Sequence, residues 1–414
     1  MVRLHQYQCE TGRTVVWMAR SKADELRQEP EQPSRATFLD LFLDLVFVFA
    51  LFRLSQGLLA HLSVRGAFQT LVLLLAVWWV WTMTAAISER FDPARPAIQL
   101  LVIGSMAASF VLAAAVPDAF GARGLVFAGA YVAVQVGRST ALVALGRGGA
   151  RQRPDVRLLF WFGVSAMPWI AGAVVHGWAR EVLWPLAVAV DYTASGLGWP
   201  TPGLGRARGA EFGLSGEFVA ERQRQFFIIA LGELITVTGL AFTTNGFEAD
   251  GSAAAGVAFA TTVLLWRIYI YRAGEVLGEA VAAAPDPLRV GVSSGNAHVV
   301  MVAGIVAISV GDDLVIRHPF EHTQPAWIAV ILGGPALFLA GRAILEYAVF
   351  SRVSADRAIG IVALAAISPA MIRTPPLVVA LAATVVLAGV AVADAARARR
   401  RPAEPPSPPA GRPS

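Results

Sequence analysis

Residues 38–60 read FLDLFLDLVFVFALFRLSQGLLA, a stretch that is apolar over almost its whole length. It is long enough to cross a bilayer as one helix, which needs about 20 residues. Similar runs follow along the chain, and they end at arginine, proline, glycine or acidic residues. Of the 414 residues, 56% are hydrophobic and 15% are charged, whereas a soluble domain carries about 25% charged residues. The sequence therefore excludes an ordinary soluble protein and predicts an integral membrane protein.

Twelve apolar runs predict an all-α protein with about twelve transmembrane helices. The eleventh run is the shortest. The predicted spans are 38–60, 67–88, 97–116, 122–145, 157–178, 182–198, 226–244, 253–272, 297–316, 326–350, 358–372 and 376–394.

The distribution of basic residues predicts the orientation of these helices. If the N-terminus is cytoplasmic, nearly all arginines and the single lysine outside the spans fall in cytoplasmic segments. The positive-inside rule favours this arrangement, which places both termini on the cytoplasmic side of a bacterial inner membrane. The basic residues left on the outer side are Arg65, Arg123, Arg180, Arg317 and Arg373, and those within spans are Arg53, Arg138, Arg267 and Arg342.

An internal repeat divides the predicted spans into two halves. A shift of about 189 residues places residues 35–48 on residues 224–237, so that Arg35 meets Arg224 and Asp44 meets Glu233. Because each half has six helices, the halves would be parallel repeats. The predicted segments are a cytoplasmic N-terminal segment (1–34), a first half (35–200), a cytoplasmic linker (201–225), a second half (226–396) and a disordered basic, proline-rich tail (397–414).

Ionisable residues within the spans are the candidate functional residues, because burying a charge in a bilayer costs at least ~2.5–3.5 kcal/mol. Asp40 and Asp44 lie one helical turn apart and could bind a cation together or share a proton. The other candidates for an ion or substrate pathway are Glu233, Asp191 and His298, with Arg35, Arg222 and Arg224 as supporting residues.

Each of these residues also has a structural interpretation. Buried acid–arginine pairs can fasten helices together, and Asp40 could stabilise the first turn of a helix beside Arg35. His298 is a single histidine in an apolar span, a setting typical of a hydrogen-bonded packing residue. Arg342 and Glu346 lie four residues apart and could satisfy each other.

Other function classes have little support in the sequence. Neither a Ser/His/Asp arrangement nor a phosphate-binding loop is present, and Cys9 is the single cysteine. We therefore expect no enzyme activity, no cofactor and no metal site. The basic residues lie at helix ends, which argues against nucleic acid as a partner.

Five blocks of sequence carry a family resemblance, at residues 35–50, 89–93, 190–192, 221–233 and 298–305. They resemble blocks of the bacterial low temperature requirement protein A (LtrA) family. The resemblance implies a multi-pass protein of the cytoplasmic membrane and names no substrate. Two positions depart from the family pattern, where Phe218 and Tyr271 stand in place of polar family residues.

Two functional hypotheses follow. The first is a secondary transporter or ion-conducting protein, in which Asp44 and Glu233 line a polar site between the halves and take up a cation or a proton. The second is a membrane scaffold or cold-adaptation factor in which the buried charges only hold helices together. Either protein has the lipid bilayer as a partner, and the sequence leaves open whether it forms a homo-oligomer.

Overall fold

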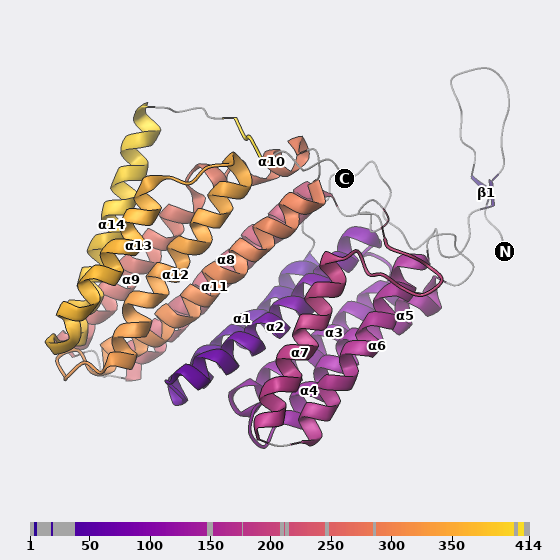
Figure 1. Cartoon of the computed structure of the whole chain (residues 1–414), viewed down its shortest axis with the longest axis horizontal. Helices are drawn as coiled ribbons and strands as arrows, with labels where there is room; N and C mark the ends of the chain where they lie inside the picture. Colours follow the sequence, from indigo (N-terminus) through magenta and orange to yellow (C-terminus); the bar gives the residue numbers. More distant parts are fainter. Residues whose placement is uncertain are drawn as a thin grey trace.

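The computed structural model describes residues 4–5, 18–19, 38–146, 152–175, 177–207, 211, 215–244, 248–284, 287–400 and 405–409. These residues are mostly helical (Figure 1). The short strands β1 (Leu4–His5) and β2 (Met18–Ala19) pair in antiparallel orientation.

The first group of helices occupies one side of the molecule and is coloured from indigo to magenta in Figure 1. A single π-helical turn, η2 (Ala133–Gly137), joins α4 to α5. The helices are α1 (Phe38–Ala60), α2 (Val64–Arg90), α3 (Pro96–Ala115), α4 (Gly124–Val132), α5 (Arg138–Leu145), α6 (Arg153–Val174) and α7 (Trp178–Gly196).

The second group lies beside the first and is coloured from pink to yellow in Figure 1. The 3-10 turns η4 (Arg272–Gly274) and η5 (Ser368–Arg373) lie between its helices. The helices are α8 (Gly216–Thr244), α9 (Ala249–Ile270), α10 (Leu277–Ala283), α11 (Pro287–Arg317), α12 (Pro325–Phe350), α13 (Ala355–Ile367) and α14 (Pro376–Arg400).

Each predicted span coincides with a helix, and ten helical segments are long and apolar enough to cross a membrane. The predicted all-α membrane protein is thus confirmed. Among the helices that coincide with predicted spans, two are not in this set. They are α1, which carries Asp40, Asp44 and Arg53, and α7, which carries Arg180, Glu181 and Asp191. Twelve spans therefore stay a prediction.

Several helices begin or end beyond the predicted spans, α11 (Pro287–Arg317) among them, and in two helices the added residues are rich in charge. α8 begins at Gly216, so residues 216–225 of the predicted linker are helical, and α14 continues to Arg400. Both extensions are rich in Ala, Glu, Gln and Arg, which favour helix. Their charges end the apolar run without ending the helix.

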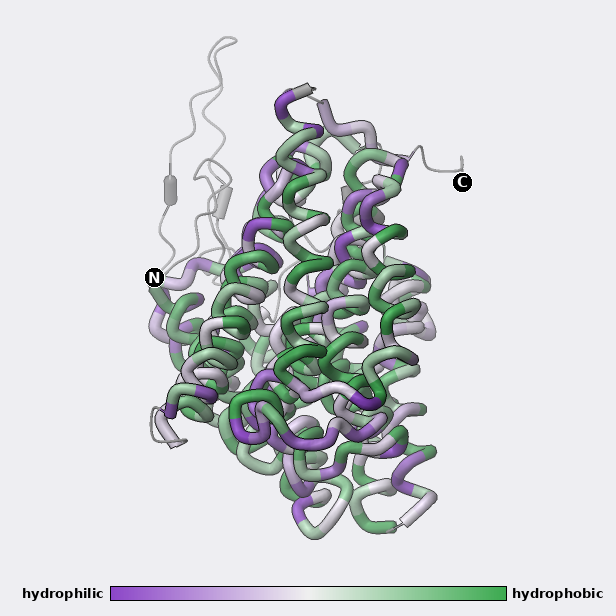
Figure 2. The backbone as a smooth tube through the Cα atoms, turned by 90° about the vertical axis from the view of Figure 1, so that its left-hand side faces the viewer, coloured by the Kyte–Doolittle hydropathy of each residue, from purple (hydrophilic) through white to green (hydrophobic). Residues whose placement is uncertain are grey.

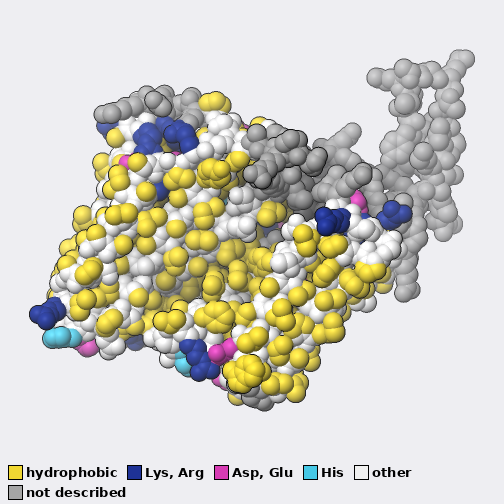
Figure 3. Space-filling view, viewed as in Figure 1, with side chains coloured by type: hydrophobic (Ala, Val, Ile, Leu, Met, Phe, Trp, Pro, Cys, Tyr) yellow, Lys and Arg dark blue, Asp and Glu magenta, His cyan; other side chains and the backbone are white. Residues whose placement is uncertain are grey.

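The surface of the helices is apolar between two charged ends. Large hydrophobic side chains are exposed on many helices, including Leu100 (70%), Val362 (65%) and Val392 (68%). Figure 3 shows hydrophobic atoms over most of the flank, with basic and acidic side chains gathered near its ends. Figure 2 shows the same distribution along the chain. Such a large exposed apolar surface is expected where lipid, instead of water, surrounds the protein.

The two groups have the same order of neighbouring helices. In the first group α1 contacts α2 and α3, and the contacts continue from α3 to α4, α6 and α7, with α7 returning to α2. In the second group α8 contacts α9 and α11, and the contacts continue to α12, α13 and α14, with α14 returning to α9. The groups meet where α1 contacts α8 and α11.

Glycines allow α11 and α12 to approach closely. A Cβ atom at Gly334 would lie 2.9 Å from Ile308 N and 3.0 Å from Gly304 O. A Cβ atom at Gly341 would lie 2.7 Å from Ala297 O. Backbone atoms cannot move away as easily as a flexible side chain, so these positions require glycine.

We predict that Gly334→Ala destabilises the protein by ~1–3 kcal/mol because the added methyl group forces α11 and α12 apart. Gly333→Ala is the matched control, since a Cβ atom there meets nothing within 4 Å. Thermal unfolding of the purified variants in detergent would measure the difference. Equal stability of the two variants would contradict the packing described here.

Candidate functional site

Asp44 on α1 forms a buried ion pair with Arg222 on α8. The guanidinium donates two hydrogen bonds to the carboxylate, from Nη2 to Oδ1 (2.8 Å) and from Nη1 to Oδ2 (3.1 Å). The indole N–H of Trp81 on α2 donates a third, 2.9 Å long, to Oδ1. Arg222 also lies over the Trp81 ring, with Cζ 5.3 Å from the centroid. The charge of Asp44 is therefore neutralised within the contact between the two groups.

Aromatic rings surround this ion pair. The centroid of the Phe226 ring on α8 lies 4.4 Å from the centroid of the Trp81 ring and 4.9 Å from that of the Trp78 ring. The ring centroid of Phe47 on α1 lies 6.4 Å from that of Phe226. These rings exclude water from the ion pair and extend the apolar contact along α1, α2 and α8.

Glu233 on α8 has a different environment. Its side chain is fully buried, and each carboxyl oxygen accepts one hydrogen bond of 2.7 Å, from Ser55 Oγ on α1 and from Ser309 Oγ on α11. Within the described part of the chain, no basic side chain forms an ion pair with it. Asp312 on α11 adds a second carboxyl group that interacts electrostatically with Glu233. Glu233 is therefore a buried carboxyl group with hydroxyl donors and without a cationic partner.

The two polar contacts show that α1 and α8 are parallel. Asp44 and Arg222 are separated by 178 positions in the chain, and so are Ser55 and Glu233. The register between the helices is thus constant over about three turns, or about 16 Å at 1.5 Å per residue. The sequence predicts that Asp44 and Glu233 line one site. In the structure both lie along the contact between α1 and α8, which we call the seam. Their positions along the helices differ by about 16 Å, at 1.5 Å per residue.

Asp40 and Arg224 do not extend the Glu233 site. Asp40 is buried in the first turn of α1, where a negative charge is favourable to the helix dipole. Arg224 is partly exposed and lies 3.6 Å from Glu221 on the same helix. Arg35 lies outside the described residues.

Asp191 belongs to a network within the first group. Tyr131 on α4 donates a 2.7 Å hydrogen bond to Asp191 Oδ2. Arg138, at the start of α5, donates to Thr84 Oγ1 (2.8 Å) and to the side-chain amide oxygen of Gln135. Asp191 and Arg138 make no direct ion pair in the described structure, although they interact electrostatically. This network does not contact Glu233.

His298 belongs to a network within the second group. Its Nδ1 lies 2.7 Å from the Ser294 carbonyl, which can only accept, so Nδ1 carries the hydrogen. Nε2 then accepts from the Tyr269 hydroxyl at 3.0 Å. Both ring nitrogens of this fully buried side chain are satisfied, an arrangement typical of a packing residue.

The expected pairing of Arg342 with Glu346 does not occur. Arg342 instead donates to the carbonyls of Ile268 and Tyr271 at the end of α9, while Glu346 accepts from Ser354 and faces Arg357. The last carbonyls of a helix have no partner within that helix, so they attract a donor from α12.

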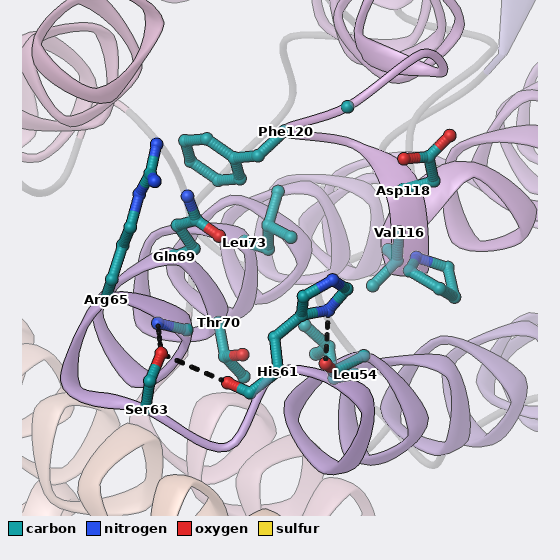
Figure 4. A pocket seen from close by; sticks show the side chains of 14 residues that line it. Leu54, His61, Ser63, Arg65, Gln69, Thr70, Leu73, Val116, Asp118 and Phe120 are labelled. Carbon is teal, nitrogen blue, oxygen red and sulfur yellow. Dashed lines mark hydrogen bonds between the residues drawn. The ribbon is translucent and has the colours of Figure 1, made fainter. Parts of the chain in front are cut away.

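A pocket of about 380 Å³ opens beside the C-terminal end of α1 (Figure 4). The side chains of His61, Gln69 and Asp118 give it a polar lining, with Phe120 on one side. Arg65 at its rim pairs with Glu181 on α7 at 2.5 Å. Leu54 and Gly57 also line the pocket and flank Ser55 in α1, so the pocket reaches the turn of α1 that contacts Glu233.

Comparison with known proteins identifies the class of this membrane protein. Residues 35–392 match the family model described as bacterial low temperature requirement A protein (LtrA). An uncharacterized protein of Rhizobium meliloti (strain 1021) is 35% identical over 328 residues, which cover 78% of this chain and 80% of the relative. No solved structure matches.

The chain belongs to the LtrA family, as the extent of the family match shows. The resemblance seen in the sequence blocks is thereby confirmed. Neither the family description nor the relative's name states a substrate.

We predict that Asp44→Asn destabilises the protein by ~3–5 kcal/mol because it leaves the buried Arg222 charge unpaired. Adding Arg222→Gln should recover part of this loss, since the double variant buries no uncompensated charge. Thermal unfolding of the two single variants and the double variant would measure the coupling. Strictly additive losses would show that the ion pair does not join the two groups.

Proposed function

We propose that this protein is a secondary transporter or an ion-conducting protein that binds a cation or a proton at Glu233. The observation that carries the proposal is the burial of this carboxyl group between α1, α8 and α11, where its donors among the described residues are hydroxyl groups. A carboxylate removed from water without a cation is very unfavourable. The group must therefore hold a proton or a cation, and exchange of that proton or cation is what a transport site requires.

The oxygen atoms around Glu233 suit either partner. Ser55 and Ser309 place hydroxyl oxygens next to the carboxyl group, and Asp312 supplies a second carboxyl group nearby. Hydroxyl and carboxylate oxygens are the ligands that hard cations prefer. The same hydroxyls can hydrogen-bond to a protonated or an ionised carboxyl group. This choice of partners supports a proton, Na⁺ or K⁺ as the transported ion.

Access to the site is supported by the pocket beside α1. The pocket reaches Leu54 and Gly57, within one turn of the serine that contacts Glu233. At the other end of α1, the Asp44–Arg222 pair and its aromatic rings close the seam between the groups. In our proposal the pocket is the outer entrance, and opening of the seam at the ion pair gives access from the cytoplasm.

We further propose that the two groups are parallel six-helix repeats, with α1 and α7 as additional spans. The shared order of neighbouring helices supports this division. So does a matching pair of buried residues, since the fourth span of each group carries an arginine and the sixth an aspartate. These pairs are Arg138 with Asp191 and Arg342 with Asp394.

The scaffold hypothesis keeps one specific observation in its favour. The Asp44–Arg222 pair is fully neutralised and joins the two groups, as a structural fastener would. A scaffold does not require the unneutralised Glu233, so the behaviour of this residue distinguishes the two hypotheses.

We predict that Glu233→Gln abolishes ion flux while leaving the protein folded. The amide keeps the shape and one acceptor oxygen of the side chain but can neither release a proton nor neutralise a cation. Flux of protons, Na⁺ and K⁺ into liposomes that contain the purified protein would measure this effect. Glu321→Gln is the matched control, because Glu321 is exposed and its ion pair is with His318, three residues away on the surface.

If the Glu233→Gln variant shows the same flux as the wild type, the ion pathway lies elsewhere in the protein. A folded, inserted wild type that transports none of the three ions would contradict ion conduction and favour a scaffold. Loss of folding in Glu233→Gln would require Ser309→Ala as a milder variant, for which we expect reduced flux because one hydroxyl contact is lost.

We also predict that Arg373 lies outside the cell and Arg352 inside, since positive charges accumulate in the cytoplasm. Arg373→Cys and Arg352→Cys, each made in a Cys9→Ser background, would be treated with a membrane-impermeant thiol reagent in intact cells. Labelling of Arg373→Cys alone is expected. The reverse pattern would overturn the orientation with cytoplasmic termini.

A further inference from the structure

A small pocket lined by arginines lies where α9, α12 and α14 end on the same side of the second group. Its basic side chains are Arg272 in η4, Arg342 on α12, Arg352 after α12 and Arg397 on α14, and we call it the arginine pocket. Glu346 is the acidic side chain that lines it. The enclosed space is about 10 Å³, room for a single oxygen atom or water molecule.

Arg342 has an unused donor at this pocket. Its side chain is 1% exposed, and its Nε and Nη2 donate to the carbonyls at the end of α9. Its Nη1 is buried and has no hydrogen-bond partner in the described structure. A buried donor without an acceptor is costly, and more so when it carries charge. Because Arg342 lines the pocket, an acceptor oxygen bound there would satisfy this donor.

The neighbouring carboxylates do not supply this oxygen. Asp394 pairs with Arg357 at 2.8 Å, and Asp356 pairs with Arg397. Glu346 accepts from Ser354 and lies 3.6 Å from Arg357. Arg342 thus makes no ion pair with a described residue. Arginines outnumber acidic side chains among the residues that line the pocket.

Arg272 is held in place beside the pocket by an unusual backbone conformation. Its φ angle is +51°, a value that non-glycine residues adopt only when the surrounding structure requires it. Two arginines lie near the Tyr271 ring, with Arg272 Cζ 5.4 Å and Arg267 Cζ 5.7 Å from its centroid. The strained turn places a guanidinium at the mouth of the pocket.

We infer that the arginine pocket binds a phosphate group. One phosphate oxygen accepts from Arg342 Nη1 inside the pocket, and the others meet Arg272, Arg352 and Arg397 at its mouth. Arginine is the residue best suited to a phosphate, because its donors match the phosphate oxygens in pairs. The phosphate belongs either to the headgroup of an anionic phospholipid or to a free phosphate ion. This site is separate from Glu233 and does not depend on the proposed transport.

The test uses the purified full-length protein in detergent. Phosphatidylglycerol, phosphatidylcholine with the same acyl chains, or inorganic phosphate is added, and bound lipid is counted by native mass spectrometry alongside thermal unfolding. We expect phosphatidylglycerol to be retained about tenfold better than phosphatidylcholine and to raise the unfolding temperature, as charge-assisted hydrogen bonds would require. The double variant Arg272→Gln/Arg352→Gln should lose this preference.

Arg373→Gln is the control, since it removes a basic residue that does not line the arginine pocket. It should keep the preference for phosphatidylglycerol. Stabilisation by inorganic phosphate alone, lost in the double variant, would identify a free phosphate ion as the ligand. If neither phosphate source binds, or the double variant binds them as well as the wild type does, a water molecule fills the pocket and the inference is wrong.

Discussion

A buried contact between two parallel helices, α1 and α8, holds the two groups of helices together. Its register is constant from the Asp44–Arg222 pair to the Ser55–Glu233 hydrogen bond. The cost of polar groups in an apolar interior constrains both contacts, because each must find its partner on the opposite helix. A shift of either helix by one residue would separate both pairs, so the seam has a single favourable alignment.

Two pairs of ionisable groups within the helices differ in how their charge is balanced. Asp44 and Asp394 have arginine partners within 3 Å, and such pairs hold helices together without needing a ligand. Glu233 and the Arg342 Nη1 atom lack a partner of opposite charge among the described residues. An incompletely satisfied group is expensive to retain in an apolar interior, so it points to a ligand instead of to folding. Both proposals made above rest on this distinction.

The sequence predicts the helices well, because hydrophobic runs and basic ends follow directly from the bilayer. It also marks Asp44, Asp191 and Glu233 as costly residues, but it does not show their partners. Arg222 lies in a polar stretch that resembles a linker, and Ser55 and Ser309 are ordinary residues in apolar helices. The 189-residue shift aligns Asp44 with Glu233 by sequence, whereas their depth depends on where each helix begins. Packing alone therefore separates the paired aspartate from the unpaired glutamate.

The most direct test of this account is the reaction of the protein with a hydrophobic carbodiimide, which modifies protonated carboxyl groups in apolar surroundings. Mass spectrometry of the digested protein would locate the modified residue. We expect modification at Glu233 and none at Asp44, with the reaction at Glu233 slowed by raising the pH or by adding the transported cation. Modification of Asp44 in preference to Glu233, or a reaction at Glu233 that neither pH nor cations affect, would contradict the account.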